Sequence, residues 1–202
     1  QNPYSYNNDR SVAGYDLTHT LSVNVLYELP FGKGKMFATN NRVLDYIIGG
    51  WQINSIGQAH SGLPYSITAD GDIANTGNSG YERANLVGNP TLSNPTAQQW
   101  FNVNAFAIPN TYTYGNSGRN ILRGPAYWNV DASIFRRFPF WENKAIEFRA
   151  EAFNTPNTVI LGQPGSDVSQ YNPKLLQQTQ FGVITNTQNS ARILQLGLKL
   201  TF

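Results

Sequence analysis

The fold is decided by the stretch Arg192-Ile193-Leu194-Gln195-Leu196-Gly197-Leu198-Lys199-Leu200-Thr201-Phe202. Leucine or phenylalanine occupies every even position from 194 to 202, and the odd positions after Ile193 are small or polar. This alternation predicts a β-strand with one apolar and one polar face. A strand that ends on an aromatic residue is typical of an outer-membrane β-barrel, whose last strand closes against the first. A half-buried strand of a soluble β-sandwich is the alternative that this stretch alone leaves open.

The composition excludes several classes of protein. Charged residues make up only 13% of the 202 residues, about half the usual share, and aromatic residues also reach 13%. A net charge of +2 is too small to indicate nucleic-acid binding. There is no cysteine, so disulfide and thiolate chemistry are absent. No stretch of about 18 apolar residues predicts a transmembrane helix. Because the chain lacks an initial Met and a leader, we expect a mature product or a fragment.

Four further segments show the same alternation. Leu21, Val23, Val25, Tyr27 and Leu29, for example, share one face of a segment that Pro30 ends, because proline cannot donate to a β-ladder. We expect an all-β fold whose strands span about 18–29, 50–68, 127–138, 144–154 and 191–202. The apolar patch 43–48 is too short to assign to a helix or a strand.

The remaining segments are polar and rich in Asn, Gly, Ser and Pro, and we expect loops at about 1–17, 69–126 and 155–190. A loop as long as 69–126 counts against a compact soluble domain. In an outer-membrane barrel the extracellular loops are long and the periplasmic turns short. If the last strand ends in the periplasm, the long loops are extracellular and the turn 139–143 is periplasmic. The periplasmic link 30–49 is then longer than usual. This asymmetry favours antiparallel transmembrane β-barrel strands.

Charged residues gather on one face of the fourth strand, at Glu147, Arg149 and Glu151. Two carboxylates could indicate glycoside hydrolysis, and the arginine could bind an anion or a luminal ligand. The favoured interpretation is a polar barrel interior, in which Arg149 neutralises both glutamates and also Asp131 across the hairpin. We therefore expect no catalytic residue, no cofactor and no enzyme activity.

Oxygen donors also gather at Asp70-Gly71-Asp72, followed by Asn75 and Asn78. Calcium would accept such ligands, but the closing Glu of an EF-hand loop is missing. A solvated Asp-Gly turn is the preferred interpretation, and we expect no metal site.

The long loop 69–126 carries aromatic residues that could stack on a sugar or a peptide. They are Tyr81, Trp100, Phe101, Phe106, Tyr112 and Tyr114. A small core of the loop itself is the favoured alternative. Tyr81, Trp100, Tyr112, Tyr114 and Arg149 are the candidate ligand-binding residues.

The pair Arg136-Arg137 lies at a strand end. These arginines could reach lipid headgroups at the periplasmic edge, and a solvated turn is the equally good alternative.

The sequence resembles TonB-dependent outer-membrane receptors of the subgroup whose N-terminal module is a carboxypeptidase regulatory-like domain. The main match is the run from Gly118 to Phe135, which contains Arg123-Gly124-Pro125-Ala126-Tyr127-Trp128-Asn129 and then Asp131, Ser133 and Phe135. Three further segments agree: Tyr27-Glu28-Leu29-Pro30-Phe31-Gly32-Lys33-Gly34, Gly50-Trp51-Gln52-Ile53-Asn54, and Phe148-Arg149-Ala150-Glu151-Ala152-Phe153-Asn154-Thr155-Pro156-Asn157. In combination these segments are specific and span nearly the whole chain.

The resemblance implies a barrel of about 22 strands with an N-terminal plug, energised through TonB. These residues would be its last five or six strands, without the plug, the TonB box or the regulatory-like domain. The implied partners are outer-membrane lipid, the TonB complex, the outer-membrane assembly machinery and an unidentified extracellular ligand, with no nucleic acid. The resemblance also implies that Leu196, Leu198, Leu200 and Phe202 form the signal that the assembly machinery recognises.

Overall fold

The computed structural model describes every residue except 39–40, 78–79 and 171–179. The chain divides into two compact units. The strand unit comprises residues 20–60, 127–159 and 189–202, and the loop unit comprises 1–19, 61–126 and 160–188.

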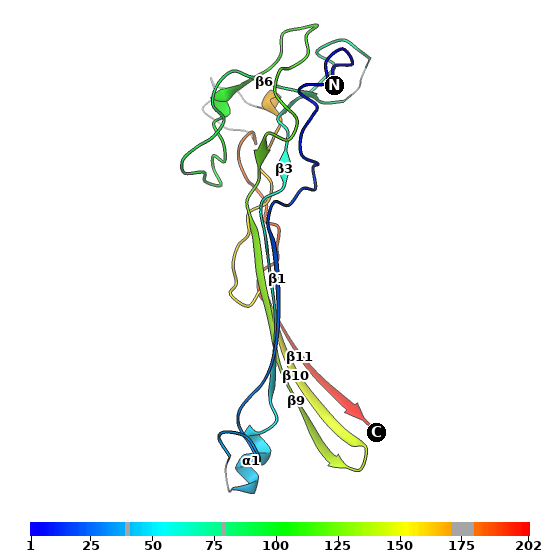
Figure 1. Ribbon diagram of the computed structural model, residues 1–202, viewed down its shortest axis with the longest axis vertical. Coiled ribbons are helices and arrows are strands. Elements are labelled where there is room, and N and C mark those ends of the chain that lie inside the picture. The colour runs from blue at the N-terminus through cyan, green and yellow to red at the C-terminus, as the bar shows by residue number, and fades with distance from the viewer. Residues whose placement is uncertain (39–40, 78–79, 171–179) are drawn as a thin grey trace. The chain divides into compact units, whose positions relative to one another are not determined.

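The strand unit is built on one antiparallel sheet with the order β1-β2-β9-β10-β11. Its strands are β1 (Thr20–Glu28), β2 (Gln52–His60), β9 (Tyr127–Trp141), β10 (Lys144–Phe153) and β11 (Ile193–Thr201). Figure 1 shows β9, β10 and β11 side by side. Among the described residues the sheet is open, because β1 and β11 are its edge strands and do not pair with each other. The coarse prediction of an all-β fold is confirmed.

The register divides the sheet into two chemically different faces. Residues opposite each other on paired antiparallel strands lie on the same face. One such row runs Val23, Gly57, Val130, and another runs Ile134, Ala150, Leu196. The apolar face consists of Leu21, Val23, Val25, Tyr27, Ile53, Ser55, Gly57, Ala59, Trp128, Val130, Ala132, Ile134, Arg136, Phe138, Ile146, Phe148, Ala150, Ala152, Leu194, Leu196, Leu198 and Leu200. The alternate residues form the polar face.

Strand β2 ends at His60, earlier than the sequence predicts. Residues 65–68, expected to extend this strand, instead belong to the loop unit, which contains β3 (Pro64–Tyr65) and β4 (Thr68–Ala69) here. A Cβ atom on Gly62 would lie 1.8 Å from the carbonyl oxygen of Gly124, so only glycine allows the two backbones to approach this closely here. This approach and the missing N–H of Pro64 explain the break.

The β9–β10 hairpin is longer than expected, because β9 continues through Pro139 to Trp141. The register shifts between Lys144 and Ala145, which pairs with Pro139. Such a bulge accommodates a residue that cannot donate to the ladder. The turn therefore shortens to two residues, with Asn143 at a φ of 60°.

The link between β1 and β2 contains the helix α1 (Arg42–Ile48). Asn41 caps its first turn by accepting the N–H groups of Val43 and Leu44, at 3.0 and 3.2 Å. Gly49 ends it, and a Cβ atom there would lie 2.8 Å from the carbonyl oxygen of Asp45. The apolar patch that the sequence left unassigned is thus helical.

The loop unit has its own hydrophobic core. Its short elements are β3, β4, β5 (Glu82–Arg83), β6 (Asn85–Leu86), β7 (Phe106–Ala107), β8 (Leu122–Arg123) and the 3-10 helices Val103–Ala105 and Val168–Gln170. The core consists of Ile67, Ala69, Ala84, Phe101, Val103, Ala105, Phe106, Val168 and Phe181. Phe101, Phe106 and Phe181 meet edge to face, with ring centroids 5.1–6.3 Å apart. Residues 69–126 and 160–188 are thus organised around one core.

Candidate functional site: the polar face and the loop unit

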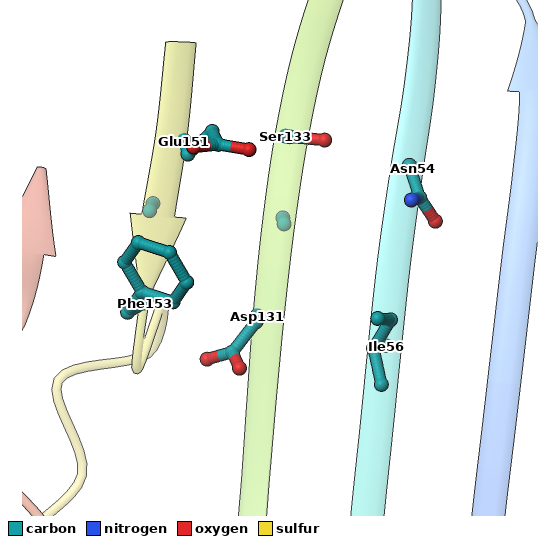
Figure 2. A pocket seen from close by; sticks show the side chains of 8 residues that line it. Asn54, Ile56, Asp131, Ser133, Glu151 and Phe153 are labelled. Atoms are coloured by element: carbon teal, nitrogen blue, oxygen red, sulfur yellow. The ribbon is translucent and has the colours of Figure 1, made fainter. Parts of the chain in front are cut away.

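The polar face contains a shallow pocket of about 120 Å³ between β2, β9 and β10. Asn54, Ser133 and Glu151 are direct cross-strand neighbours in this region. Figure 2 shows their side chains together with those of Asp131, Ile56 and Phe153. The pocket therefore combines hydrogen-bonding groups with an apolar margin.

Arg149 lies between two carboxylates on the polar face of β10. Its guanidinium nitrogens lie 3.2 Å from Glu147 and 3.5 Å from Glu151. The guanidinium carbon lies 5.2 Å from the centre of the Phe135 ring, within range of a cation–π contact. All three charged side chains remain partly exposed, so water weakens these ion pairs. The sequence prediction that Arg149 neutralises Glu147 and Glu151 agrees with this geometry.

The predicted pairing of Arg149 with Asp131 is wrong. The register places Phe135 opposite Arg149, so Asp131 lies farther along the strand. Asp131 instead accepts hydrogen bonds at Oδ1 from Asn129 Nδ2 and the backbone N–H of Asn154, both at 2.8 Å. This carboxylate therefore holds the end of the hairpin.

The candidate aromatic residues divide into two groups. Phe101 and Phe106 are buried in the loop core, and Trp100 packs against it while donating Nε1–H to the carbonyl of Arg123 at 2.9 Å. Tyr114 is partly buried. Tyr81 and Tyr112 are 62% and 73% exposed. Phe101 and Phe106 belong to the loop core and Trp100 packs against it, whereas Tyr81 and Tyr112 are exposed and could stack on a ligand.

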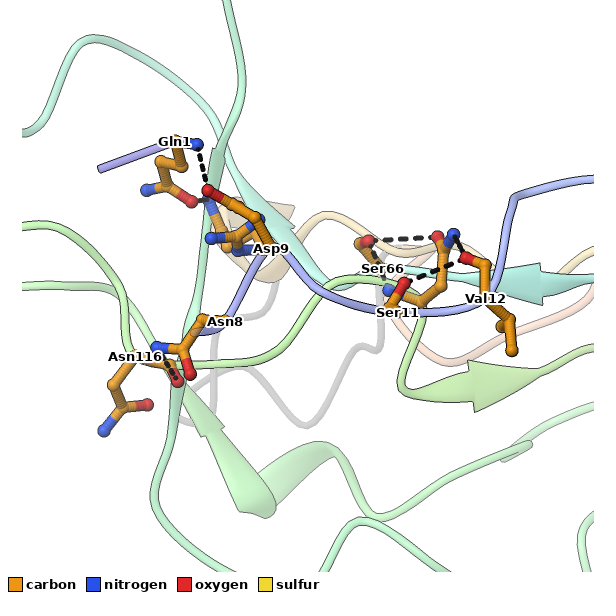
Figure 3. A network of polar contacts seen from close by, with 9 residues as sticks. Gln1, Asn8, Asp9, Ser11, Val12, Ser66 and Asn116 are labelled. Carbon is orange, nitrogen blue, oxygen red and sulfur yellow. Dashed lines mark hydrogen bonds and ion pairs between the residues drawn. The ribbon is translucent and has the colours of Figure 1, made fainter. Parts of the chain in front are cut away.

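The segment 1–19 is part of the loop unit, which the sequence patterns do not indicate. Asp9 forms an ion pair with Arg83, and Asp16 forms one with Arg123. Figure 3 shows part of the associated network, in which Asn8 Nδ2 donates to the carbonyl of Asn116 at 3.1 Å. Alternation and periodicity carry no signal for such contacts, because they arise from single polar side chains in irregular segments.

Asp70 and Gly71 are exposed, and a turn follows at Asp72, whose carbonyl oxygen accepts the backbone N–H of Asn75 at 3.1 Å. The backbone N–H groups of Thr76 and Gly77 donate to the Asp72 carboxylate, each at 2.7 Å. These bonds, chiefly the one from the backbone N–H of Thr76, hold the pKa of the Asp72 carboxyl below its usual range. Asn78 lies outside the described residues. Across the residues that the structure does describe, no three His, Cys, Asp or Glu side chains gather as a metal site would require.

The proposed assembly signal lies on an edge strand. Leu196, Leu198 and Leu200 all occupy the apolar face of β11 and are more than half exposed, and Phe202 follows the strand and is 91% exposed.

Residues 1–195 match the family described as "Outer membrane beta barrel domain". The chain belongs to the outer-membrane β-barrel domain family. It is therefore a protein of the bacterial outer membrane, and its long strands are transmembrane β-strands. In such barrels the outward face meets lipid and the inward face meets water, which assigns the apolar face to lipid and the polar face to the barrel interior.

No curated protein and no solved structure matches this outer-membrane β-barrel domain. In the part of the chain outside the gaps 39–40, 78–79 and 171–179, no helix has the length and apolar character needed to cross a bilayer.

Proposed function

We propose that this chain forms part of the barrel wall and the extracellular ligand mouth of a TonB-dependent outer-membrane receptor or transporter. We further propose that this receptor belongs to the subgroup with an N-terminal carboxypeptidase regulatory-like domain. The family membership of residues 1–195 supports the barrel, and the segment from Gly118 to Phe135 supports the TonB-dependent subgroup by resemblance.

One observation carries the receptor proposal: the loop unit is folded around its own core rather than splayed into separate loops. Its three segments are joined by buried aromatic contacts and by the ion pairs of Asp9 with Arg83 and Asp16 with Arg123. A preformed surface loses little conformational entropy when it binds a ligand. Tyr81 and Tyr112 are among its exposed aromatic side chains and are available for stacking.

The polar face would form part of the interior wall. Its Glu147–Arg149–Glu151 cluster offers charges of both signs to a plug or a passing solute. The two edge strands β1 and β11 require partners, because unpaired backbone groups are costly in hydrocarbon. Five strands are fewer than the smallest barrels use, so further strands would close the barrel, up to about 22 in total.

The proposed partners are outer-membrane lipid, the outer-membrane assembly machinery, an unidentified extracellular ligand and the TonB complex, the last through a segment outside these residues. The proposed role is transport without an enzymatic step, with no cofactor and no contact with nucleic acid. Membership of the outer-membrane family argues against the alternative of a secreted carbohydrate-binding sandwich. A surface adhesin barrel that works without TonB is the competing function.

The full-length protein decides between these functions. A TonB-dependent receptor has a plug and a TonB box before the barrel, and the C-terminal domain of TonB can be cross-linked to that box in membranes. The adhesin alternative predicts neither segment and no cross-link. Outer-membrane fractionation and heat-modifiable gel mobility, measured on the same protein, test the barrel independently of TonB.

A further inference from the structure

One charged residue interrupts the apolar face of the sheet. Arg136 of β9 is the sole charged side chain among the apolar-face residues named above. An uncovered guanidinium in the hydrocarbon region of a bilayer is costly. Arg136, however, is only 7% exposed, so other groups of the protein cover it.

Three aromatic rings cover Arg136. Its guanidinium carbon lies 4.4 Å from the ring centre of Phe138, 5.6 Å from that of Tyr46 and 6.0 Å from that of Trp51. Phe138 also contacts both other rings, with centroid distances of 5.9 Å to Tyr46 and 6.2 Å to Trp51. These contacts combine cation–π attraction with exclusion of water, and they join α1 to β9 and to Trp51, the residue before β2.

The C-terminal turn of α1 completes this cover. The carbonyl oxygen of Ile47 accepts hydrogen bonds from Arg136 Nη1 at 2.7 Å and from Trp51 Nε1 at 3.0 Å. Last-turn carbonyls lack partners within the helix and carry partial negative charge, so a cation is favourable there. Arg136 therefore fixes α1 against the lipid-facing side of the sheet.

In this position α1 exposes apolar side chains. Val43 is 69% exposed, Leu44 44% and Ile47 58%. They belong to the same helix as Tyr46, whose ring contacts Phe138 of the apolar face. The same link carries Lys35 and Arg42, and a short amphipathic helix beside basic residues suits the boundary between phospholipid headgroups and acyl chains.

We propose that α1 is an interfacial helix, whose Val43, Leu44 and Ile47 side chains insert among the phospholipids at this edge of the barrel. Arg136 holds the helix there. The proposal rests on the assignment of the apolar face to lipid and goes beyond the receptor function, since it holds for a transporter or an adhesin barrel alike.

The absence of cysteine from these residues allows a direct test. Single variants V43C, L44C and I47C of the full-length protein, with any cysteine outside these residues replaced, would carry an environment-sensitive fluorophore. The proteins would be reconstituted in vesicles of phosphatidylethanolamine and phosphatidylglycerol. Quenching is measured with doxyl-labelled phospholipids and with aqueous iodide. K33C, on the same link but exposed, is the water control, and L198C on the apolar face is the lipid control.

We expect doxyl quenching at positions 43, 44 and 47 to exceed that at position 33 by about twofold or more, and iodide quenching to be correspondingly weaker. The label near the headgroup should quench these sites better than a label deep in the acyl chain. Equal iodide quenching at positions 33 and 44 would overturn the proposal. Protection from iodide without doxyl quenching would also overturn it, because a protein partner would then cover the helix.

The lipid control separates this inference from the barrel itself. If L198C is not quenched by doxyl lipids, the assignment of the apolar face fails. If L198C is quenched and L44C is not, the barrel stands and only the interfacial helix is wrong.

A second variant tests the anchor. We expect R136A to lower doxyl quenching at L44C toward the K33C value and to leave quenching at L198C unchanged. R136K keeps the charge but loses the planar stacking of the guanidinium, so its quenching at L44C should lie between that of R136A and that of the parent. Unchanged quenching at L44C in the R136A background would show that α1 does not depend on Arg136.

Discussion

The carboxylate of Asp131 in β9 accepts the backbone N–H of Asn154, the residue that follows β10, with 2.8 Å between Oδ1 and N. Asn154 is only 6% exposed and has a φ of 50°. Its side-chain Nδ2 donates to the carbonyls of Thr158 and Ser190, at 3.0 and 2.9 Å. Asp131 therefore fixes the residue from which the β10–β11 connection starts, and the Asn154 side chain bonds to both ends of that connection, at Thr158 and Ser190.

We expect Asp131→Ala to destabilise the strand unit by about 1–3 kcal/mol, because the buried N–H of Asn154 loses its acceptor. Asp131→Asn keeps a side-chain oxygen at this position and should cost less. The midpoint of the heat-induced gel shift of the full-length protein measures both variants. Equal midpoints for Asp131→Ala and the parent would contradict the role assigned to Asp131.

Tyr65 of β3 should make the loop unit sensitive to alkali. Its buried hydroxyl has no hydrogen-bond partner among the described residues, and burial raises the pKa of this phenol above its usual value near 10. A raised folded-state pKa gives a contribution to stability that is complete below pH of about 10 and is lost as pH rises through the folded pKa. Tyr65→Phe should remove this dependence and stabilise the loop unit by about 1 kcal/mol at neutral pH.

Protease resistance of the loop unit from pH 7 to 11 measures the effect of Tyr65. The Tyr112→Phe variant is the matched control, because Tyr112 is exposed and should leave the pH profile unchanged. If Tyr65→Phe has the same dependence of protease resistance on pH as the parent protein, another group causes the loss of stability at high pH.

Phe181→Ala should open the loop core. Phe181 is fully buried against Phe101 and Phe106, so its truncation should cost about 3–5 kcal/mol of loop-unit stability. We expect faster proteolysis within residues 61–126 while the barrel keeps its heat-modifiable mobility. Tyr112→Ala removes a similar aromatic ring from the surface and should leave the proteolysis rate near that of the parent.

A charge on the apolar face of β11 should destabilise the barrel. Leu198→Arg places a guanidinium on the lipid-facing side, which costs about 2–4 kcal/mol near the bilayer midplane. Lys199→Gln alters the neighbouring residue on the opposite face and should cost far less. We expect the free energy of unfolding in urea to fall for Leu198→Arg but not for Lys199→Gln. Equal decreases in both variants would contradict the assignment of the two faces.

Phe202→Asp tests the proposed assembly signal separately from stability. Phe202 lies after β11, so its replacement leaves the paired residues of the strand unchanged. We expect a lower amount of barrel in the outer membrane and unchanged unfolding of the fraction that assembles. Wild-type assembly levels would show that the aromatic residue is not part of the signal.

Alternation alone was sufficient to predict the long strands, because each must present one face to lipid and one to water. The expected ranges 18–29 and 191–202 differ from β1 and β11 by a few terminal residues. The bulge at Pro139 was missed, since a proline favours a turn unless the partner strand absorbs the extra residue.

The loop unit could not be predicted in this way. Its core side chains come from irregular segments that share no period, and their contacts depend on pairings such as Phe101 with Phe181. The ion pair of Arg83 with Asp9 could not be predicted for the same reason. The helix α1 is too short for a periodicity argument, and its position depends on Arg136, which is distant in sequence.

The shared core of the loop unit has a consequence for engineering and for evolution. A chimaera that grafts one loop of this protein onto a related barrel would carry half of a hydrophobic interface and expose it to solvent. Phe101 and Phe106 would arrive without Phe181, or Phe181 without them. Under the receptor function proposed above, ligand specificity should therefore be transplanted as a set, with 1–19, 61–126 and 160–188 exchanged together. Under the same proposal, recombination within one of these segments should yield barrels that assemble without binding the ligand.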